Sequence, residues 1–290
     1  MNIDGQTQLF GIIGHPVAHS LSPVMHNGAL AAMGINGVYV PMDTVDPKMA
    51  VAGLRALGFV GVSVTVPHKV AVMEHLDEVD PVAQRIGAVN TLLFRRKSGE
   101  EEVVVRGFNT DWLGSNLALA DKMQLAGGKV VVLGAGGAAK GVCFGLVEAG
   151  AEVIIANRTE EKGRALADWL GCDFVPAAGL DDIRADALVN TTSVGMEPNS
   201  ADIAINPELL DHFSVVMDIV YAPLRTRLLQ EAARAGCRTI DGLTMLLNQA
   251  AVQLKIWTGK RPPMDVMRRA LEGELERRKF GKIISADQNL

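Results

Sequence analysis

The sequence lacks the features of several protein classes, beginning with disulfide-rich and metal-binding proteins. Its three cysteines, Cys143, Cys172 and Cys237, form no CxxC pair and no metal-ligand spacing, which favours a reducing cytoplasm. The amino-terminal residues lack a basic segment followed by an apolar core, so we expect no signal peptide. No apolar run approaches the ~20 residues that cross a bilayer, so we expect no membrane association.

Positive charge is also not in excess. Lys and Arg number 28 against 33 Asp and Glu, for a formal net charge of -5. A nucleic-acid partner is therefore not expected, because binding to phosphates needs clustered basic residues. An anionic ligand must be bound by a few placed groups. His15, His19 and His26 are too irregularly spaced for a metal site on one helix face, and we expect no metal.

What the sequence contains is a regular alternation of short apolar strands and helical segments. At 290 residues the chain is long enough for two domains. The alternation predicts an α/β protein with mostly parallel sheets covered by helices on both faces. The segments expected as strands are 9–14, 38–42, 62–66, 90–94, 129–136, 152–158, 186–193, 215–220 and 238–240, and the helical segments between them include 22–34, 47–58 and 69–79.

Domain boundaries follow from breaks in this pattern. The polar segment 95–109 is expected to form a hairpin that returns the chain, and a helix then leads into Gly127-Gly128, after which the alternation restarts. Beyond Asp241 the pattern is wholly helical, and these last helices have no strand partners. We therefore expect a first domain of residues 1–110 plus 242–290, with the final helices folded back onto it, and a second domain of residues 111–241.

The second domain opens with a glycine-rich loop, Gly134-x-Gly136-x-x-Ala139, between an apolar strand and a helix. Glycine allows the tight turn and lets backbone N–H groups approach a pyrophosphate at the helix N-terminus, while alanine keeps helix and strand close. A glycine turn of purely structural origin is the alternative. Because strand, loop, helix and second strand fall at the expected distances, the sequence predicts a dinucleotide-binding, Rossmann-like doubly wound domain.

The end of the second strand selects the dinucleotide. NAD sites place a carboxylate there for the ribose 2′-hydroxyl, whereas NADP sites use arginine for the 2′-phosphate. This chain has Ala156-Asn157-Arg158-Thr159 and no carboxylate before Glu160. The alternative is that Arg158 only caps a loop. The residues favour NADP.

Polar residues in the first domain indicate a second binding region. Lys69 follows "SVTVPH" where a strand ends and a helix is expected to begin, a place where a cation needs a nearby anion. Asp111, in "GFNTDW", lies at another passage from strand to helix and is a candidate partner, although Asn109, Thr110 or Asp111 could instead cap the following helix. A Lys–Asp pair can hold a proton ready for a developing alkoxide.

A third cluster lies in "GHPVAHSLSPVMHN". Ser20 and Ser22, two residues apart before a helix, can direct both hydroxyls at one carboxylate. Ser22-Pro23 also fits an N-cap followed by proline at the first helical position.

Together these pieces resemble the shikimate dehydrogenase family. The motifs that carry the resemblance run in family order from about Gly14 to Ala250, nearly the whole chain; they are "GHPVAHSLSPVMHN", "SVTVPHK", "GAVNTL", "GFNTDW", "GAGGAA", "NRT", "NTTSVGM", "DIVYAPLRTRLL" and "DGLTMLLNQA". The resemblance implies an N-terminal α/β substrate domain, an NADP domain, and the reversible reduction of 3-dehydroshikimate to shikimate with NADPH in aromatic amino acid biosynthesis.

The resemblance also assigns roles to residues. It implies Lys69 and Asp111 as the catalytic pair, and substrate contacts from Ser20, Ser22, Thr65, Asn90, Tyr221 and Gln249. For the cofactor it implies Gly134, Gly136, Gly137, Ala138, Asn157, Arg158, Thr159 and Gly242. Thr65 could instead be a core strand residue, and Asn90 could only close a strand end. A buried amide such as that of Gln249 needs hydrogen-bond partners.

The sequence departs from the family pattern at a few positions. Ser63 stands where the family usually has asparagine, Thr244 where glycine is common, and Lys162 where some members carry a second arginine. The alternative functions are a quinate or dual quinate/shikimate dehydrogenase that uses NAD, a different NADP dehydrogenase, and a non-catalytic NADP-binding sensor. The sequence is compatible with a monomer or a homodimer.

Overall fold

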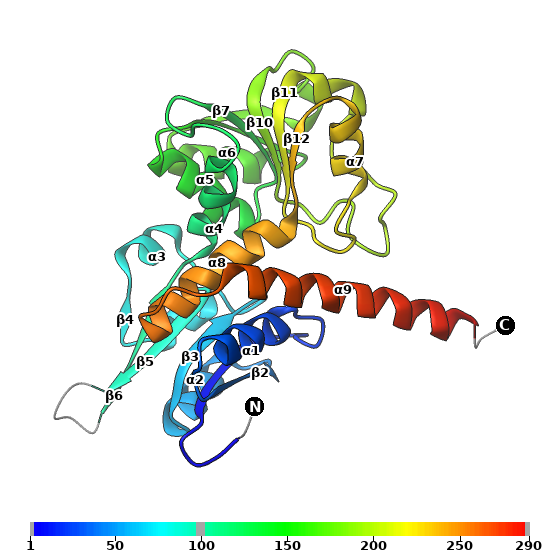
Figure 1. The fold of residues 1–290 in the computed structure, drawn as a ribbon. Coiled ribbons are helices and arrows are strands. Elements are labelled where there is room, and N and C mark those ends of the chain that lie inside the picture. Colours follow the sequence, from blue (N-terminus) through cyan, green and yellow to red (C-terminus); the bar gives the residue numbers. More distant parts are fainter. Residues whose placement is uncertain (1–2, 97–101, 288–290) are drawn as a thin grey trace. The chain divides into compact units, whose positions relative to one another are not determined.

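The structure, a computed structural model, describes residues 3–96 and 102–287, with side chains as far as Arg278 in the last helix (Figure 1). The chain divides into two compact units. The first unit comprises Met1–Thr110 and Ala250–Leu290, and the second comprises Asp111–Gln249. Over the described ranges, no helix combines the length and the apolar character needed to span a bilayer.

The first unit is built on a six-stranded mixed sheet with strand order β2-β1-β3-β5-β6-β4. β1 is parallel to both β2 and β3, β4 is parallel to β6, and β5 is antiparallel to β3 and β6. The sheet is therefore mainly parallel, as predicted. The strands are β1 (Gln8–Gly14), β2 (Gly37–Asp43), β3 (Phe59–Val64), β4 (Glu78–Val79), β5 (Thr91–Arg96) and β6 (Val103–Phe108).

Helices cover this sheet, and the final helix of the chain is among them. The prediction that the C-terminal helices return to the first domain is confirmed for α9, which packs along α1. The contact is close, since a Cβ built on Gly28 of α1 would lie 3.5 Å from the Cβ of Ala270. The helices that contribute to this unit are α1 (Ser22–Ala32), α2 (Pro47–Ala56), η1 (Ala71–His75), α3 (Pro81–Ile86), α8 (Gly242–Thr258, from Ala250 onward) and α9 (Met264–Asp287).

Two contacts fix helices to this sheet. A Cβ on Gly61 of β3 would overlap the indole of Trp257, so only glycine lets α8 approach here, and the Trp257 Nε1–H donates to the Leu92 carbonyl at 2.9 Å. At the outer strand β2, the Asn27 side chain of α1 donates to the Tyr39 carbonyl and accepts from the Tyr39 N–H, both at 2.8 Å. The amide of Asn27 thus fills the backbone sites that a further strand would use.

The prediction of a helix over residues 69–79 is wrong. Residues 66–70 form a turn, followed by the short 3₁₀ helix η1 and the strand β4. The Asp77 N–H donates to the Val105 carbonyl at 3.1 Å, and the Val105 N–H donates to the Asp77 carboxylate at 2.6 Å. Pairing with β6 therefore draws this segment into the sheet and ends the helical turn early.

The predicted hairpin is confirmed in its strands. β5 and β6 pair antiparallel, with Thr91 opposite Phe108 and Arg96 opposite Val103. The connecting part of the prediction, residues 97–101, lies outside the described residues.

The second unit contains a six-stranded, wholly parallel sheet in the order β12-β11-β10-β7-β8-β9. Numbered within this unit, the order is 6-5-4-1-2-3, which is the doubly wound Rossmann arrangement that the glycine loop predicted. The strands are β7 (Lys129–Leu133), β8 (Glu152–Asn157), β9 (Asp173–Pro176), β10 (Ala185–Asn190), β11 (Phe213–Asp218) and β12 (Arg238–Ile240). The strand β9 had no counterpart among the predicted segments.

Successive residues of the central strands enter different cores. On β7, Val130 and Val132 pack in one cluster, while Val131 and Leu133 pack in another. A strand buried on both faces needs such a continuous apolar run, which explains the sequence "KVVVL". The helices of this unit are α4 (Asp111–Ala120), α5 (Gly137–Glu148), α6 (Glu160–Leu170), η2 (Ala177–Gly179), η3 (Pro207–His212), α7 (Arg227–Arg234) and the start of α8 as far as Gln249.

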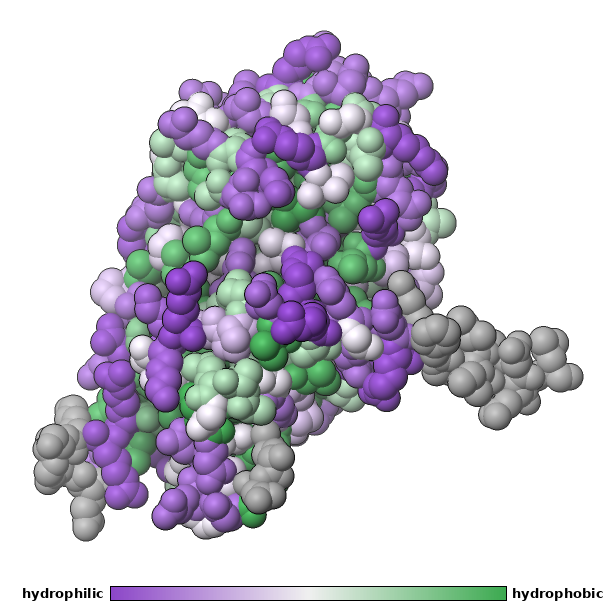
Figure 2. Space-filling model, viewed as in Figure 1, coloured by the Kyte–Doolittle hydropathy of each residue, from purple (hydrophilic) through white to green (hydrophobic). Residues whose placement is uncertain are grey.

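Figure 2 shows hydrophilic side chains over much of one face, with hydrophobic ones scattered among them. Scattered exposed apolar residues are ordinary for a globular protein.

Candidate functional site

In the first unit, the predicted substrate residues Ser20 and Thr65 lie on segments that follow the parallel strands β1 and β3. Ser22 is the first residue of α1, and Asn90 immediately precedes β5. The loops after β1 and β3 are joined by hydrogen bonds from the Thr65 N–H to the Ile13 carbonyl (2.9 Å) and from the His15 N–H to the Val66 carbonyl (3.0 Å). A Cβ on Gly14 would overlap the methyl group of Thr65, so glycine is required for this approach. Carboxyl ends of parallel strands are where α/β sheets bind ligands.

Ser20 and Ser22 lie together at the start of α1. The Ser22 N–H donates to the Ser20 Oγ at 3.2 Å, which fixes the hydroxyl group of Ser20 beside the helix terminus. The expected N-cap role of Ser22 is not what the structure has. The helix begins at Ser22, and the cap position is Leu21, whose side chain makes no capping hydrogen bond. Ser22 is buried, with the Tyr39 hydroxyl beside it.

Thr65, Lys69 and Asn90 are brought close by backbone contacts. The Val89 N–H donates to the Lys69 carbonyl at 2.8 Å, and the Val64 N–H donates to the Asn90 carbonyl at 2.8 Å. The chain at Lys69 therefore runs beside the residue that precedes Asn90. Lys69 is half-buried and Asn90 is buried, so both positions lie at the edge of the protein interior.

The Asn90 amide has a fixed orientation. Its Oδ1 accepts from the Thr110 N–H at 2.8 Å and from the Thr91 hydroxyl at 2.7 Å, and its Nδ2 donates to the Thr110 Oγ1 at 3.0 Å. A backbone N–H can only donate, so the atom facing Thr110 N must be the carbonyl oxygen of the amide. The alternative that Asn90 merely closes a strand end is too limited, because its side chain also joins β5 to the residue before α4.

A series of buried, hydrogen-bonded polar side chains supports this arrangement; it is called the polar chain here. The Gln253 Nε2 donates to the Thr91 Oγ1 at 2.9 Å and to the Asn90 carbonyl at 3.1 Å. The Gln253 Oε1 accepts from the Ser63 hydroxyl at 2.9 Å, and Ser63 accepts from the Tyr39 hydroxyl at 2.7 Å. Ser63, the position that departs from the family pattern, thus connects β2 and β3 to α8. Sequence reasoning missed Gln253, although an amide on an apolar helix is a usable signal.

Asp111 is the first residue of α4 and belongs to the second unit. A Cβ built on Gly141 would lie 3.5 Å from the Cβ of Asp111, so α4 starts against the helix that follows the glycine loop. Its predicted partner Lys69 belongs to the first unit. Their pairing stays a prediction.

The glycine loop has the form that dinucleotide binding requires. Gly134 has a φ of 111°, and a Cβ there would lie 2.7 Å from the Thr191 Oγ1, so a larger residue is excluded on both counts. Gly136 is the N-cap of α5, and a Cβ on Gly136 or Gly137 would meet no protein atom within 4 Å. The helix has no acidic residue in its first turn. Open space before a helix N-terminus fits a pyrophosphate.

The residues expected at the adenosine phosphate lie beside this loop. β7 and β8 are paired, and the Gly134 N–H donates to the Ala156 carbonyl at 2.9 Å. The Asn157 Nδ2 donates to the Thr159 carbonyl at 2.8 Å, which shapes the turn that carries the exposed Arg158. An exposed guanidinium without a carboxylate at the strand end fits a 2′-phosphate. These residues therefore fit NADP.

A buried carboxylate organises the carboxyl ends of β10 and β11. Asp218 accepts hydrogen bonds from the Asn190 Nδ2 (3.0 Å), the Val220 N–H (3.0 Å) and the Thr226 hydroxyl (2.6 Å). Burial raises the pKa of Asp218, although each of these hydrogen bonds opposes the rise. Sequence reasoning did not single out Asp218. The carboxylate holds the segment that carries Tyr221, which is half-buried.

Gly242 and Gln249 lie on α8 within the second unit. A Cβ on Gly242 would overlap the Ile219 carbonyl oxygen, so this backbone passes close to the end of β11. Gln249 is 8% exposed, and its Nε2 donates to the Leu246 carbonyl at 3.1 Å. A Cβ on Gly114 of α4 would lie 2.8 Å from the Cβ of Gln249. The approach of α4 therefore restricts the position of this side chain.

The histidines lie in separate environments. His15 bonds Asp43 at 2.6 Å, and this hydrogen bond lowers the pKa of Asp43. His26 is fully buried and stacks on Tyr39 with ring centroids 4.3 Å apart. Burial lowers the pKa of His26 to about 3, so it is neutral at physiological pH. Over the described part of the chain, no group of three or more His, Cys, Asp or Glu side chains is placed to hold a metal ion.

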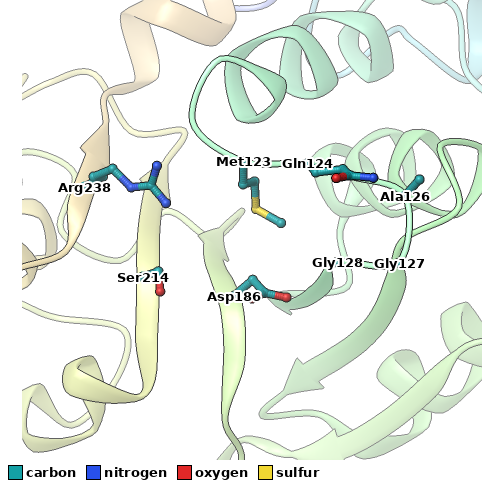
Figure 3. A pocket seen from close by; sticks show the side chains of 8 residues that line it. All are labelled: Met123, Gln124, Ala126, Gly127, Gly128, Asp186, Ser214 and Arg238. Atoms are coloured by element: carbon teal, nitrogen blue, oxygen red, sulfur yellow. The ribbon is translucent and has the colours of Figure 1, made fainter.

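A pocket of about 300 Å³ lies at the amino ends of the strands of the second sheet, opposite to the end that carries the glycine loop (Figure 3). It is lined at the start of the strands by Gly128, Asp186, Ser214 and Arg238. The glycine loop follows the other end of β7, so this pocket is separate from the predicted nucleotide site.

Comparison with known families gives matches along most of the chain. Residues 12–92 match the shikimate dehydrogenase substrate-binding domain. Residues 116–196 match the shikimate/quinate 5-dehydrogenase family, and residues 242–272 match the shikimate 5′-dehydrogenase C-terminal domain. The matched ranges include the carboxyl ends of β1 and β3, the glycine loop and the start of α8.

Individual relatives cover nearly the whole chain. The shikimate dehydrogenase (NADP(+)) of Methanothermobacter thermautotrophicus is 46% identical over 95% of this chain and 99% of its own length. A crystal structure of a shikimate dehydrogenase in complex with NADP+ has a TM-score of 0.88 and 40% identity, covering 94% of this chain and 98% of that one. The Thermus thermophilus enzyme in complex with NADP(H) and shikimate has a TM-score of 0.82 and 41% identity, covering 92% and 99%. With this identity over nearly its full length, the chain belongs to the shikimate dehydrogenase family.

Proposed function

We propose that this protein is an NADP-dependent shikimate dehydrogenase that reversibly reduces 3-dehydroshikimate to shikimate, a step in aromatic amino acid biosynthesis. The observation that carries the proposal is the 46% identity to a shikimate dehydrogenase (NADP(+)) over 95% of the chain. The polar residues that follow β1 and β3 and that precede β5 support a substrate region, and the glycine loop after β7 supports a nucleotide region.

The cofactor assignment rests on residues of the second unit. Gly134, Gly136, Gly137 and Ala138 would hold the pyrophosphate, and Asn157, Arg158 and Thr159 would hold the adenosine 2′-phosphate, with Gly242 at the close backbone passage beside the cofactor. NADPH supplies a hydride when bound, and the protein supplies orientation and charge. The geometry of Gly134 and the exposure of Arg158 support this assignment.

The substrate assignment rests on both units. Ser20 and Ser22 would donate hydrogen bonds to the substrate carboxylate, and Thr65, Asn90 and Gln249 would bind its hydroxyl groups, with Tyr221 near the substrate. The fixed amide of Asn90 supports its role, because a preset orientation lowers the entropy lost on binding.

Lys69 and Asp111 would act as the catalytic pair. During reduction, the Lys69 ammonium gives a proton to the carbonyl oxygen while the carbon is reduced, and during oxidation the amine, or a water held by the pair, takes that proton back. The Asp111 carboxylate would orient the ammonium. General acid–base catalysis of this kind contributes about 10²–10⁴ in rate.

The remaining assignments follow from these roles. Residues 1–110 with 242–290 would form the substrate-binding and catalytic domain, and residues 111–241 the NADP-binding domain. The protein would act as a monomer or homodimer in the cytoplasm, and its three free cysteines suit a reducing compartment.

The test is the NADPH absorbance band on mixing the protein with NADP+ and shikimate. We expect the band to appear with NADP+ and shikimate. It should appear more slowly when quinate replaces shikimate, and the corresponding NADH band should appear more slowly when NAD+ replaces NADP+. Faster turnover of quinate with NAD+ would identify the quinate dehydrogenase alternative. Tight binding of NADPH without turnover of either acid would identify a sensor and overturn the proposal.

A further inference from the structure

The last helix reaches the loop that carries Ser20. Arg278 of α9 donates through Nη1 to the His19 carbonyl at 2.9 Å and through Nη2 to the Ser20 carbonyl at 3.3 Å. Arg278 and His19 are 259 positions apart in the sequence. The loop between β1 and α1 is therefore tethered to the C-terminal end of the same unit.

Glu274, one turn earlier on α9, holds the guanidinium in place. Its Oε1 accepts from the Arg278 Nε at 2.7 Å, while its two oxygens accept from Arg277 at 2.8 Å each. The side chain of Glu274 is 7% exposed, whereas that of Arg278 is 34% exposed. These hydrogen bonds, chiefly that from Arg277, lower the pKa of Glu274 to about 2, so it is a carboxylate at neutral pH.

The guanidinium of Arg278 donates through all three of its nitrogens. Nε donates to the carboxylate of Glu274, and the two terminal nitrogens donate to successive carbonyls of the loop. A lysine ammonium is a point charge on a flexible stem and cannot hold all three acceptors in one plane. Hydrogen bonds from a charged donor are also stronger than neutral ones.

The tethered peptide carries the hydroxyl groups predicted to bind the substrate. The Ser20 N–H donates to the Val17 carbonyl at 3.0 Å, and the Ser22 N–H donates to the Ser20 Oγ at 3.2 Å. These local bonds set the shape of the loop, and the bonds from Arg278 set its position relative to the helices α1 and α9. Small displacements of a positioning group are sufficient to weaken recognition substantially.

We propose that Arg278, oriented by Glu274, is a positioning residue for substrate binding, which holds the 19–20 peptide so that the Ser20 and Ser22 hydroxyls converge on the substrate carboxylate. The inference rests on the proposed function, since it takes Ser20 and Ser22 as the carboxylate-binding pair. Arg278 acts through the loop backbone and not through contact with the substrate.

The neighbouring Arg277 gives a matched control. Both arginines bond the same carboxylate, but the Arg277 side chain is 75% exposed and its hydrogen bonds in the described structure go to Glu274. The full-length variants Arg278→Ala, Arg278→Lys and Arg277→Ala are compared by steady-state kinetics with shikimate and NADP+. We expect Arg278→Ala to raise KM for shikimate about tenfold, with kcat and KM for NADP+ within about twofold of the parent. Arg278→Lys should resemble Arg278→Ala, and Arg277→Ala should resemble the parent.

Hydrogen exchange of the segment 15–22 provides a readout that is independent of turnover. We expect faster amide exchange there in Arg278→Ala than in Arg277→Ala, with equal exchange in the second unit. Equal exchange in the two variants, a parental KM in Arg278→Lys, or equal kinetic changes in the two alanine variants would overturn the inference. If the parent protein turns over no shikimate, the proposed function fails, while the exchange measurement still decides whether Arg278 tethers the loop.

Discussion

The two units place their buried polar groups differently. In the second unit Asn190 and Thr226 gather around Asp218 where strands end, and the buried residues of the central strand β7 are apolar. In the first unit a polar chain from Tyr39 through Ser63 and Gln253 to Asn90 runs beneath the predicted substrate residues. The comparison suggests that a nucleotide is recognised mainly by backbone geometry, whereas a small polyhydroxy acid is recognised by side chains whose orientation needs support.

The strongest test of this contrast is the loss of the Lys69 ammonium. Lys69→Ala should lower kcat by about 10²–10⁴ while KM for shikimate changes little, because a proton donor acts mainly in the transition state. Kinetics with NADP+ and shikimate measure both. Lys255→Ala, an exposed lysine of the same unit, is the control. A rise in KM with unchanged kcat would mean that Lys69 only binds.

In the second unit the largest effect should come from Arg158. Arg158→Ala should raise KM for NADP+ about 10–150-fold, since a charge-assisted bond to phosphate is lost, and should leave KM for NAD+ within about twofold. Kinetics with each cofactor test this. Arg164→Ala removes another exposed arginine of this unit, which pairs with Glu160 at 3.2 Å, and should change neither value. Equal losses for both cofactors would contradict the NADP assignment.

The polar chain of the first unit should matter for stability. Gln253→Leu removes an amide that is 1% exposed, and with it the buried hydrogen bonds to Ser63, Thr91 and the Asn90 carbonyl, so we expect the free energy of unfolding to fall by about 1–3 kcal/mol. Urea denaturation measures the loss. Gln230→Leu, an exposed amide of the second unit, should change it by less than about 0.5 kcal/mol. Similar losses in the two variants would remove the distinction between the units.

The smallest expected effect concerns Glu274 and depends on pH. The pKa of Glu274 is about 2 in the folded protein against an ordinary value of 4.5, so its stabilising effect is present above pH 4.5 and is lost as the pH falls toward 2. Glu274→Gln should therefore lower the free energy of unfolding at pH 7 by about 1 kcal/mol. The difference in the free energy of unfolding between Glu274→Gln and the parent should disappear as the pH falls toward 2. The control is Glu272→Gln, which removes the carboxylate of the more exposed pair with Arg268. A stability difference between Glu274→Gln and the parent that is independent of pH would contradict stabilisation by the ionised carboxylate of Glu274.

Much of the second unit could be predicted because its signals are local. The apolar run 130–133, the glycine at position 134 and the helix after it are contiguous, and each has one physical reason. The strand β9 was missed because it is four residues long, and its two central residues are only half-buried. The nucleotide loop is therefore easier to predict from the sequence than β9, the edge strand of the same sheet.

The first unit was less predictable because its decisive contacts join distant residues. Ser63 and Gln253 are 190 positions apart, and no local pattern links a serine of a strand to an amide of the final helices. The helix expected from Lys69 onward fails for the same reason, since its end is set by pairing with β6. The contact of Arg278 with the loop could not be predicted from the sequence, because a charged residue on a terminal helix is usually solvated.

The amide of Asn27 also bears on how copies of this protein can meet. An outer strand with open N–H and carbonyl groups invites a strand from another molecule, which leads to extended sheets or aggregates. On β2 the groups of Tyr39 are already taken by a side chain of α1, so this position cannot nucleate such growth. A homodimer of this protein would therefore not form by continuation of the first sheet through Tyr39.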